Sequence, residues 1–423
     1  MIKKLKNSHF LKAVSVYTTS SFLNSGITFL LLPLMTRHLT SEQYGILAMI
    51  NATVSVLAPF VGMSIVTAIE RQMVESNKVE NSKYVFNSLI LYFVSSLIVG
   101  IIIYILRDFM FKLTGIPKNY LWIVLVIAIS DVVINVALVV MQFNEKPVLF
   151  GLYKNSETVM NVGISVFLVV ILHMALDGRL YGIVISKIVF FIIGFFIIKE
   201  LVGINPTFRP DYIKDELVNF GIPLIPIALK TSILTYLDRI FITNMESVSE
   251  TGLYSVGNQL SLPILFLAQA FNLAYLPWLY KKLKLGNLEE EKRIIKLTYI
   301  YFFLIIAIAI VWGIITSFFT VFIVGANYKG AESYIIWLSL GYAFTGMHMM
   351  VVAYIYYSKK IKLYNIVTIV VILSNVVLNY IFIESEGAVG AAQATTVVNV
   401  INFSLTWILA TKVHKMPWKI FAK

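Results

Sequence analysis

Residues 221–245 read GIPLIPIALKTSILTYLDRIFITNM, a run that is apolar enough to cross a bilayer. The same run carries Lys230, Asp238 and Arg239. A charge at the centre of a membrane helix costs about 2.5–3.5 kcal/mol on insertion scales. A spanning segment with three charges is therefore expected to give them partners or water.

The rest of the chain has the same apolar character. It has 423 residues, of which 59% are hydrophobic and 13% charged, whereas about 25% of a soluble domain is charged. The mean hydropathy is +0.84, and apolar runs of about 20 residues, each able to span a bilayer, recur from end to end. The apolar run after the basic N-terminus continues to about Met35, too long for a signal peptide, and is interpreted as an uncleaved first span. The composition predicts an all-α multi-pass membrane protein.

Twelve membrane spans are predicted. They cover residues 13–35, 44–68, 85–106, 119–141, 155–176, 180–198, 217–243, 252–280, 297–320, 333–357, 364–383 and 388–411. With the N-terminus inside the cell, 25 Lys and Arg fall in cytoplasmic segments, six in outer loops and three within spans. Because basic residues accumulate on the cytoplasmic side, this distribution predicts that both termini are cytoplasmic.

Composition also excludes several classes of function. The net charge of +12 is explained by the basic cytoplasmic loops, so nucleic acid is not expected as a partner. The chain has no cysteine, and its five histidines are scattered without metal-ligand spacing. Disulfides and thiolate chemistry are excluded, and neither a metal site nor an organic cofactor is predicted.

Three short sequence patterns recur in the second half of the chain at nearly the same separation from their first occurrence. Gly45 and Asn51 are each followed, 207 residues later, by Gly252 and Asn258. NEK at 144–146 and SKK at 358–360 are 214 residues apart, and GRLYG at 178–182 and GAVGAA at 387–392 are 209 apart. The order predicts two six-helix bundles, 1–199 and 217–423, joined by a cytoplasmic linker at 200–216. Since six is even, a pseudo-twofold axis along the membrane normal would relate them.

The intramembrane charges allow two interpretations: buried ion pairs that lock helices together, or a watery cavity with excess positive charge. In the second, an anion would bind Arg71, Lys187, Lys230 and Arg239. Asp238 would orient Arg239 or pair across to another helix, because adjacent residues on a helix do not face each other. A coupling cation, H⁺ or Na⁺, could use Glu70 and Asp131.

Small and amide residues inside the spans are also open to a structural interpretation. Asn51 and Asn258 could form hydrogen bonds between helices or line a cavity. Two pairs of small residues, Gly178 with Gly182 and Gly387 with Ala391, are four apart and predict close helix packing.

Three segments carry a resemblance to a known family. TRHLTSEQYGILAM at 36–49, with Arg37, Glu42 and its YG pair, resembles the first outer turn of polysaccharide-unit flippases. The opening stretch through Phe241, followed by ETGLYSVG at 250–257, is similar to their seventh-span signature, and EGAVGAAQATTV at 386–397 resembles the start of their last span. The chain thus resembles the Wzx-type, O-antigen branch of the multidrug/oligosaccharidyl-lipid/polysaccharide (MOP) exporter superfamily. Lys230 matches no pattern of that family, so its role depends on charge alone.

The resemblance implies a MATE-like, V-shaped pair of bundles in the bacterial inner membrane. It implies alternating access that carries an undecaprenyl-pyrophosphate-linked oligosaccharide (O-antigen, capsule or exopolysaccharide) to the outer leaflet. Membrane lipids, a polysaccharide polymerase and a chain-length regulator are the further partners it implies, and no enzymatic activity is expected.

Two alternatives stay open. One is a multidrug or other lipid-linked precursor exporter of the same superfamily, although organic cations would favour an acidic cavity. The other is a membrane-embedded polymerase or glycosyltransferase. The longest outer loops, 107–118 and 321–332, are 12 residues each and hold no pair of catalytic carboxylates, which disfavours the enzyme.

The predicted topology can be tested with single cysteines, because the chain has none of its own. A cysteine at Asn287 should be protected from a membrane-impermeant thiol reagent in whole cells, and one at Ser247 should react, since the Lys and Arg distribution places them on opposite sides. Labelling at Asn287 would contradict the twelve-span topology.

Overall fold

The computed structural model describes residues 9–75, 78–214, 221–284, 286–358 and 360–418. The chain forms two compact units, Met1–Tyr236 and Leu237–Lys423. This boundary falls inside α11 (Ile222–Met245), later than the linker at 200–216. The division into bundles at that linker stays a prediction, and the two units are described separately.

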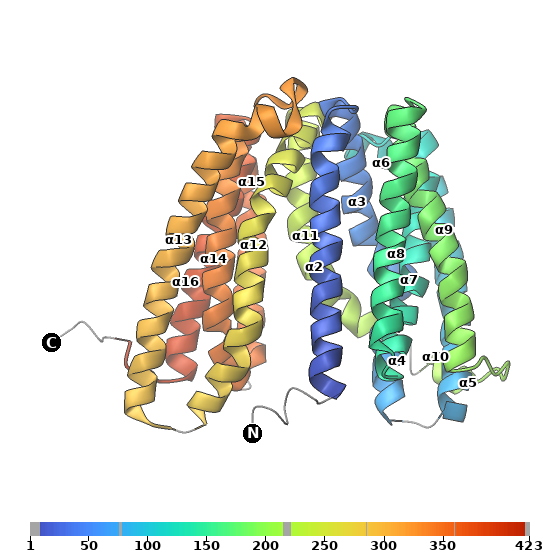
Figure 1. Cartoon of the computed structure of the whole chain (residues 1–423), viewed down its shortest axis with the longest axis horizontal. Coiled ribbons are helices and arrows are strands. Elements are labelled where there is room, and N and C mark those ends of the chain that lie inside the picture. The colour runs from blue at the N-terminus through green and yellow to red at the C-terminus, as the bar shows by residue number, and fades with distance from the viewer. Residues whose placement is uncertain (1–8, 76–77, 215–220, 285, 359, 419–423) are drawn as a thin grey trace. The chain divides into compact units, whose positions relative to one another are not determined.

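The first unit is a bundle of helices (Figure 1). Its elements are α2 (His9–Thr36), α3 (Ser41–Gly62), α4 (Ile65–Glu75), α5 (Lys78–Ile105), α6 (Arg107–Thr114), η1 (Lys118–Tyr120), α7 (Leu121–Phe143), α8 (Pro147–Val166), η2 (Phe167–Ile171), α9 (Ala175–Leu201) and α10 (Pro210–Lys214). Helix α9 packs against both α7 and α8, while α2 packs on α8 and α3 packs on α7. The mostly buried α7 therefore lies at the centre of this bundle.

The second unit starts within α11 and is built around one central helix. The following elements are α12 (Val248–Leu283), α13 (Leu288–Val324), η4 (Ala326–Tyr328), α14 (Glu332–Tyr357), α15 (Ile361–Glu386) and α16 (Ala388–Val413). Helix α14 packs against α12, α13 and α16, and α15 packs on α16. With 37 residues, α13 is roughly 55 Å long, so it extends beyond a hydrocarbon core of about 30 Å.

The helices confirm the predicted class, an all-α membrane protein. In the described part of the chain, nine helical segments are long and apolar enough to cross a membrane. They lie in α3, α5, α7, α9 and α12 to α16. The other three predicted spans overlap the long helices α2, α8 and α11. Residues 217–220 of the seventh predicted span lie outside the described residues.

Two predicted spans contain a break of the helix in the structure. The predicted helix at 44–68 is broken, because Met63 and Ser64 have φ values of 44° and 57° and interrupt the helical hydrogen bonds between α3 and α4. The helix that contains the start of the fifth predicted span, 155–176, begins earlier, at Pro147, since proline suits the first turn of a helix. Its end at Ile171 is followed by His173, whose φ is 53°.

The helix starts support the internal repeat. The side chain of Thr40 accepts a hydrogen bond from the backbone N–H of Gln43 at 3.2 Å, and that of Ser247 accepts one from Glu250 at 3.1 Å. These two N-caps are separated by the same 207 residues as the glycine and asparagine marks. In both halves the three-residue polar mark, NEK or SKK, directly precedes a helix.

Part of the 200–216 linker is fixed to the first unit. The Asn87 side chain donates to the carbonyl of Thr207 at 2.9 Å and accepts from the backbone N–H of Arg209 at 2.8 Å. The Tyr212 hydroxyl donates to Glu80. The start of α5 therefore holds the linker in place as far as α10.

Glycines allow close helix contacts at the predicted positions. A Cβ at Gly182 would lie 2.3 Å from Ser165 Oγ and 2.8 Å from its backbone, and one at Gly178 would lie 2.9 Å from the backbone of Leu168. The prediction for this pair is thus confirmed. Gly387 acts differently, because its φ of 64° forms the turn between α15 and α16, and the close contact there belongs to Gly390, where a Cβ would be 2.0 Å from Phe382 O.

Gly182→Ala should lower the stability of the first unit by about 1–3 kcal/mol, because the added methyl group cannot fit against the backbone of Ser165. The measurement is the thermal unfolding of purified protein in detergent. Gly163→Ala is the matched control, since a Cβ there meets no atom within 4 Å. Equal unfolding temperatures for both variants would contradict the close contact.

Candidate functional site

Asp238 is the centre of a buried polar cluster in the second unit. Its side chain is only 5% exposed. One carboxylate oxygen, Oδ1, accepts hydrogen bonds from the amides of Asn379 at 2.8 Å and Asn375 at 3.2 Å. The other, Oδ2, accepts from the hydroxyls of Thr395 at 2.8 Å and Tyr254 at 3.1 Å. Four neutral donors from α12, α15 and α16 thus surround one carboxylate.

Hydrogen bonds explain how this charge is tolerated. Each bond to a charged group contributes about 1.5–3 kcal/mol, so four of them offset the cost of a carboxylate in a membrane helix. The two asparagines are one helical turn apart on α15, and therefore share a face. Within the described chain no Lys or Arg forms an ion pair with Asp238.

Arg239, the residue after Asp238, contacts α12 through a different side chain. Its Nε lies 3.4 Å from Ser255 Oγ on α12, and the side chain is half-buried. Asp238 contacts three other helices and not its neighbour, in agreement with the expectation that it pairs across to another helix.

A second polar cluster lies in the first unit and joins three helices. Lys187 on α9 forms ion pairs with Asp131 on α7 at 2.6 Å and with Glu157 on α8 at 3.1 Å. These ion pairs are half-buried and join three helices, as in the interpretation of charge pairs that lock helices together. The cluster carries one more negative than positive charge, and the predicted roles of Lys187 in anion binding and Asp131 in cation coupling stay predictions.

The remaining candidate residues are more dispersed. Glu70 and Arg71 are half-buried on α4, and Asn51 is exposed on the surface of its unit. Asn258 accepts a hydrogen bond from the Tyr342 hydroxyl at 2.7 Å, which joins α12 to α14. Lys230 belongs to α11, but its side chain lies outside the described residues.

Sequence reasoning missed most partners of these charges. Asn375 and Asn379 lie in SNVVLNY, where amides four apart in an apolar run are a usable signal. Glu157 carries no such signal. Arg179, counted as an outer-loop charge, instead donates to Asn161 Oδ1 and Ser165 Oγ, both at 2.6 Å.

The Asp238 cluster is able to hold a small cation. Carboxylate, amide and hydroxyl oxygens are the ligands that hard cations prefer. The Oδ1 atoms of Asn375 and Asn379 are buried, and in the described chain they have no hydrogen-bond partner. Rotation of either amide would exchange its nitrogen for this oxygen beside the carboxylate, an arrangement that a cation or a proton stabilises. Among the described residues no group of three or more His, Cys, Asp or Glu could hold a metal ion.

Comparison with known proteins assigns the chain to a family. The model of the family described as "Polysaccharide biosynthesis protein" matches residues 10–282. The chain belongs to this polysaccharide biosynthesis family. The predicted resemblance to a family of polysaccharide biosynthesis is thereby confirmed.

Relatives and solved structures agree with this assignment. "Lsg locus putative protein 1" of Haemophilus influenzae is 25% identical over 94% of this chain and 98% of its own length. The lipid II flippase MurJ in an inward closed conformation has a TM-score of 0.76 at 17% identity, over 95% of this chain and 87% of that one. An inward-facing multidrug resistance MATE transporter of the MOP superfamily has a TM-score of 0.70 at 15% identity, over 93% and 95%. At such identities these two structures show the fold, which is that of a membrane transporter.

Proposed function

We propose that this protein is a flippase that carries an undecaprenyl-pyrophosphate-linked oligosaccharide to the outer leaflet of the bacterial inner membrane by alternating access. One observation carries the proposal: a transporter fold occurs in a chain of the polysaccharide biosynthesis family. Neither a polymerase nor a glycosyltransferase activity is needed to explain that combination.

The substrate's head group explains the intramembrane cations. A pyrophosphate is anionic and loses its hydration in hydrocarbon, so arginine and lysine side chains must replace the water. Arg239 is the strongest candidate, because its planar guanidinium binds phosphate oxygens in a bidentate manner. Lys230 and Arg71 are proposed to bind the head group at other depths.

The family match favours this proposal over its alternatives. A multidrug exporter shares the fold, as the MATE transporter shows, but the family match refers to polysaccharide biosynthesis. Both termini are proposed to lie in the cytoplasm. The substrate is proposed to enter from the same side, where it is synthesised. A polymerase and a chain-length regulator on the outer side are the proposed protein partners.

Deletion of the gene should cause lipid-linked repeat units to accumulate on the cytoplasmic side, as measured by their protection from periplasmic enzymes. Arg239→Ala and Lys230→Ala should then fail to restore surface polysaccharide. Arg239→Lys should restore part of it, because the charge remains while the bidentate geometry is lost. A matched control is Lys329→Ala, which removes an exposed cation between α13 and α14.

Protein levels decide how these variants are interpreted. Normal export by both alanine variants at native expression would contradict the head-group role. If export falls only because the variant protein does not accumulate in the membrane, these charges have a structural role, as buried pairs that hold helices together.

We also propose that export is coupled to a small cation, H⁺ or Na⁺, bound at Asp238. The support is the carboxylate with four neutral donors and the two buried amide oxygens beside it. Asp131 and Glu70 were predicted for this role, but Asp131 is paired with Lys187, so Asp238 is the stronger candidate.

If Na⁺ binds at Asp238, replacing K⁺ by Na⁺ should raise the unfolding temperature of the purified protein, by about 2–4 °C for each kcal/mol of binding free energy. Asp238→Asn should abolish that difference, whereas Asp211→Asn, on α10, should keep it. If protons couple instead, Na⁺ should have no effect and export should depend on the pH gradient. Export that depends on neither gradient would contradict the proposal.

A further inference from the structure

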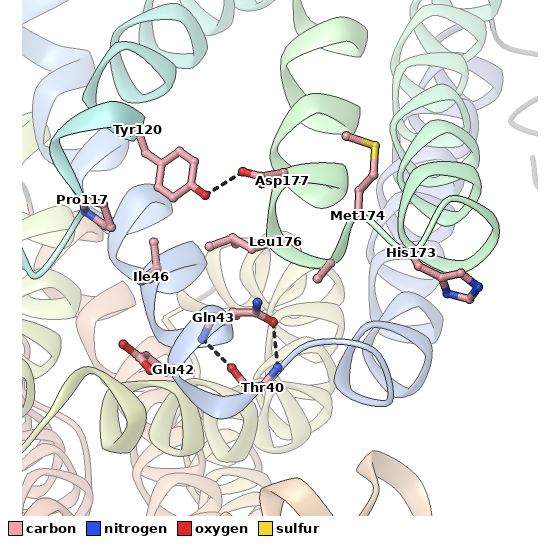
Figure 2. A pocket seen from close by; sticks show the side chains of 11 residues that line it. Thr40, Glu42, Gln43, Ile46, Pro117, Tyr120, His173, Met174, Leu176 and Asp177 are labelled. Carbon is pink, nitrogen blue, oxygen red and sulfur yellow. Dashed lines mark hydrogen bonds between the residues drawn. The ribbon is translucent and has the colours of Figure 1, made fainter.

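The first unit has a hollow where three chain segments meet. It is open to one side and has a volume of about 430 Å³, within the range of about 300–1,000 Å³ for small-molecule sites. It lies at the start of α3, at η1 before α7, and at the start of α9 (Figure 2). In the predicted topology all three segments are on the outer side of the membrane.

The polar side chains of this hollow offer both hydrogen-bond donors and acceptors. The Tyr120 hydroxyl donates to Asp177 Oδ1 at 2.6 Å (Figure 2), so the other carboxylate oxygen can accept from a ligand. The Gln43 side-chain oxygen accepts from the backbone N–H of Thr40 at 3.0 Å, which leaves its amide N–H groups as donors. Glu42 adds an exposed carboxylate.

Apolar side chains complete the lining. Ile46 and Leu176 are 9% and 5% exposed and lie beside the polar groups. A hollow with an apolar surface and a few directed polar groups suits a ligand that has both kinds of face. A sugar ring is such a ligand, because its C–H face is apolar and its hydroxyls both donate and accept.

The charge of the hollow decides between classes of ligand. Glu42 and Asp177 each lie in the first turn of a helix, where a carboxylate is favoured by the helix dipole. The helix dipole therefore explains why each carboxylate lies at a helix start. It does not explain why both carboxylates line the same hollow as Tyr120, which comes from a third segment of the chain. Two carboxylates repel an anionic head group and accept hydrogen bonds from hydroxyls, so the pocket selects against pyrophosphate.

We propose that this pocket binds a sugar residue of the transported oligosaccharide on the outer side of the membrane. The inference depends on the proposed function and extends it by a second binding site. The pyrophosphate would bind among basic residues, and the sugar would bind in this acidic pocket. The first unit would then hold the sugar after its passage, while the basic residues release the head group.

Binding can be measured on the full-length protein in nanodiscs by saturation-transfer NMR. The probes are methyl glycosides of glucose, galactose and N-acetylglucosamine, with inorganic pyrophosphate as the anionic comparison. At least one glycoside should bind, and pyrophosphate should not compete with it. Asp177→Asn and Glu42→Gln should each weaken that binding about tenfold, because a hydrogen bond to a charged group is lost.

Asp108→Asn is the matched control. This carboxylate on α6 is exposed, pairs with Lys118 and does not line the pocket, so its loss should leave glycoside binding unchanged. Glu42→Gln alters an exposed side chain, which keeps the test valid if Asp177→Asn fails to fold. The inference is overturned if none of the glycosides binds. It is also overturned if both variants bind glycosides as tightly as the wild-type protein.

Export in cells separates this inference from the proposed function. If the deletion strain accumulates lipid-linked units and complementation with the wild-type gene removes them, the proposed function holds. If Asp177→Asn and Glu42→Gln also bind glycosides normally, the pocket alone is wrong. If the deletion causes no accumulation, the proposed function fails, and with it the assignment of the sugar to a transported substrate.

Discussion

A bilayer supplies no water to the polar groups of a protein inside it, and this constraint shapes the whole chain. The backbone satisfies it through helices, whose hydrogen bonds are all internal. Side chains satisfy it through partners on neighbouring helices. Asp238 accepts four hydrogen bonds from three other helices, and Lys187 pairs with carboxylates from two. Each unit thus contains a polar cluster that joins several of its helices.

These two clusters differ in a way that matters for transport. In the cluster around Lys187 an ammonium group already pairs with two carboxylates, so the place of a cation is taken and the cluster is suited to holding helices together. The Asp238 carboxylate accepts hydrogen bonds from neutral donors only, and no ion pair to it is formed within the described chain. A cation or proton can therefore enter the second cluster at lower cost than the first, which is the physical basis for preferring it as a coupling site.

Charge also divides the proposed substrate path by chemistry. Cationic side chains within the membrane suit a pyrophosphate, whereas the hollow beside Tyr120 carries two carboxylates. A substrate with an anionic head and a neutral sugar chain matches both. The division avoids tight binding of the whole substrate at one place, which would slow its release because every added contact lowers the rate of dissociation.

The sequence by itself determined the class of fold and the number of long helices in the described part of the chain. These follow from local quantities, namely hydropathy, charge in loops and the spacing of small residues. It also indicated that Asp238 and Arg239 face different surroundings, because their positions on one helix require it. Only the tertiary structure decided which partners they meet. Asn375, Asn379 and Thr395 are more than 130 residues from Asp238, and no local pattern specifies such pairs. The break at Met63, the Lys187 cluster and the hollow at the helix starts depend likewise on packing between distant segments.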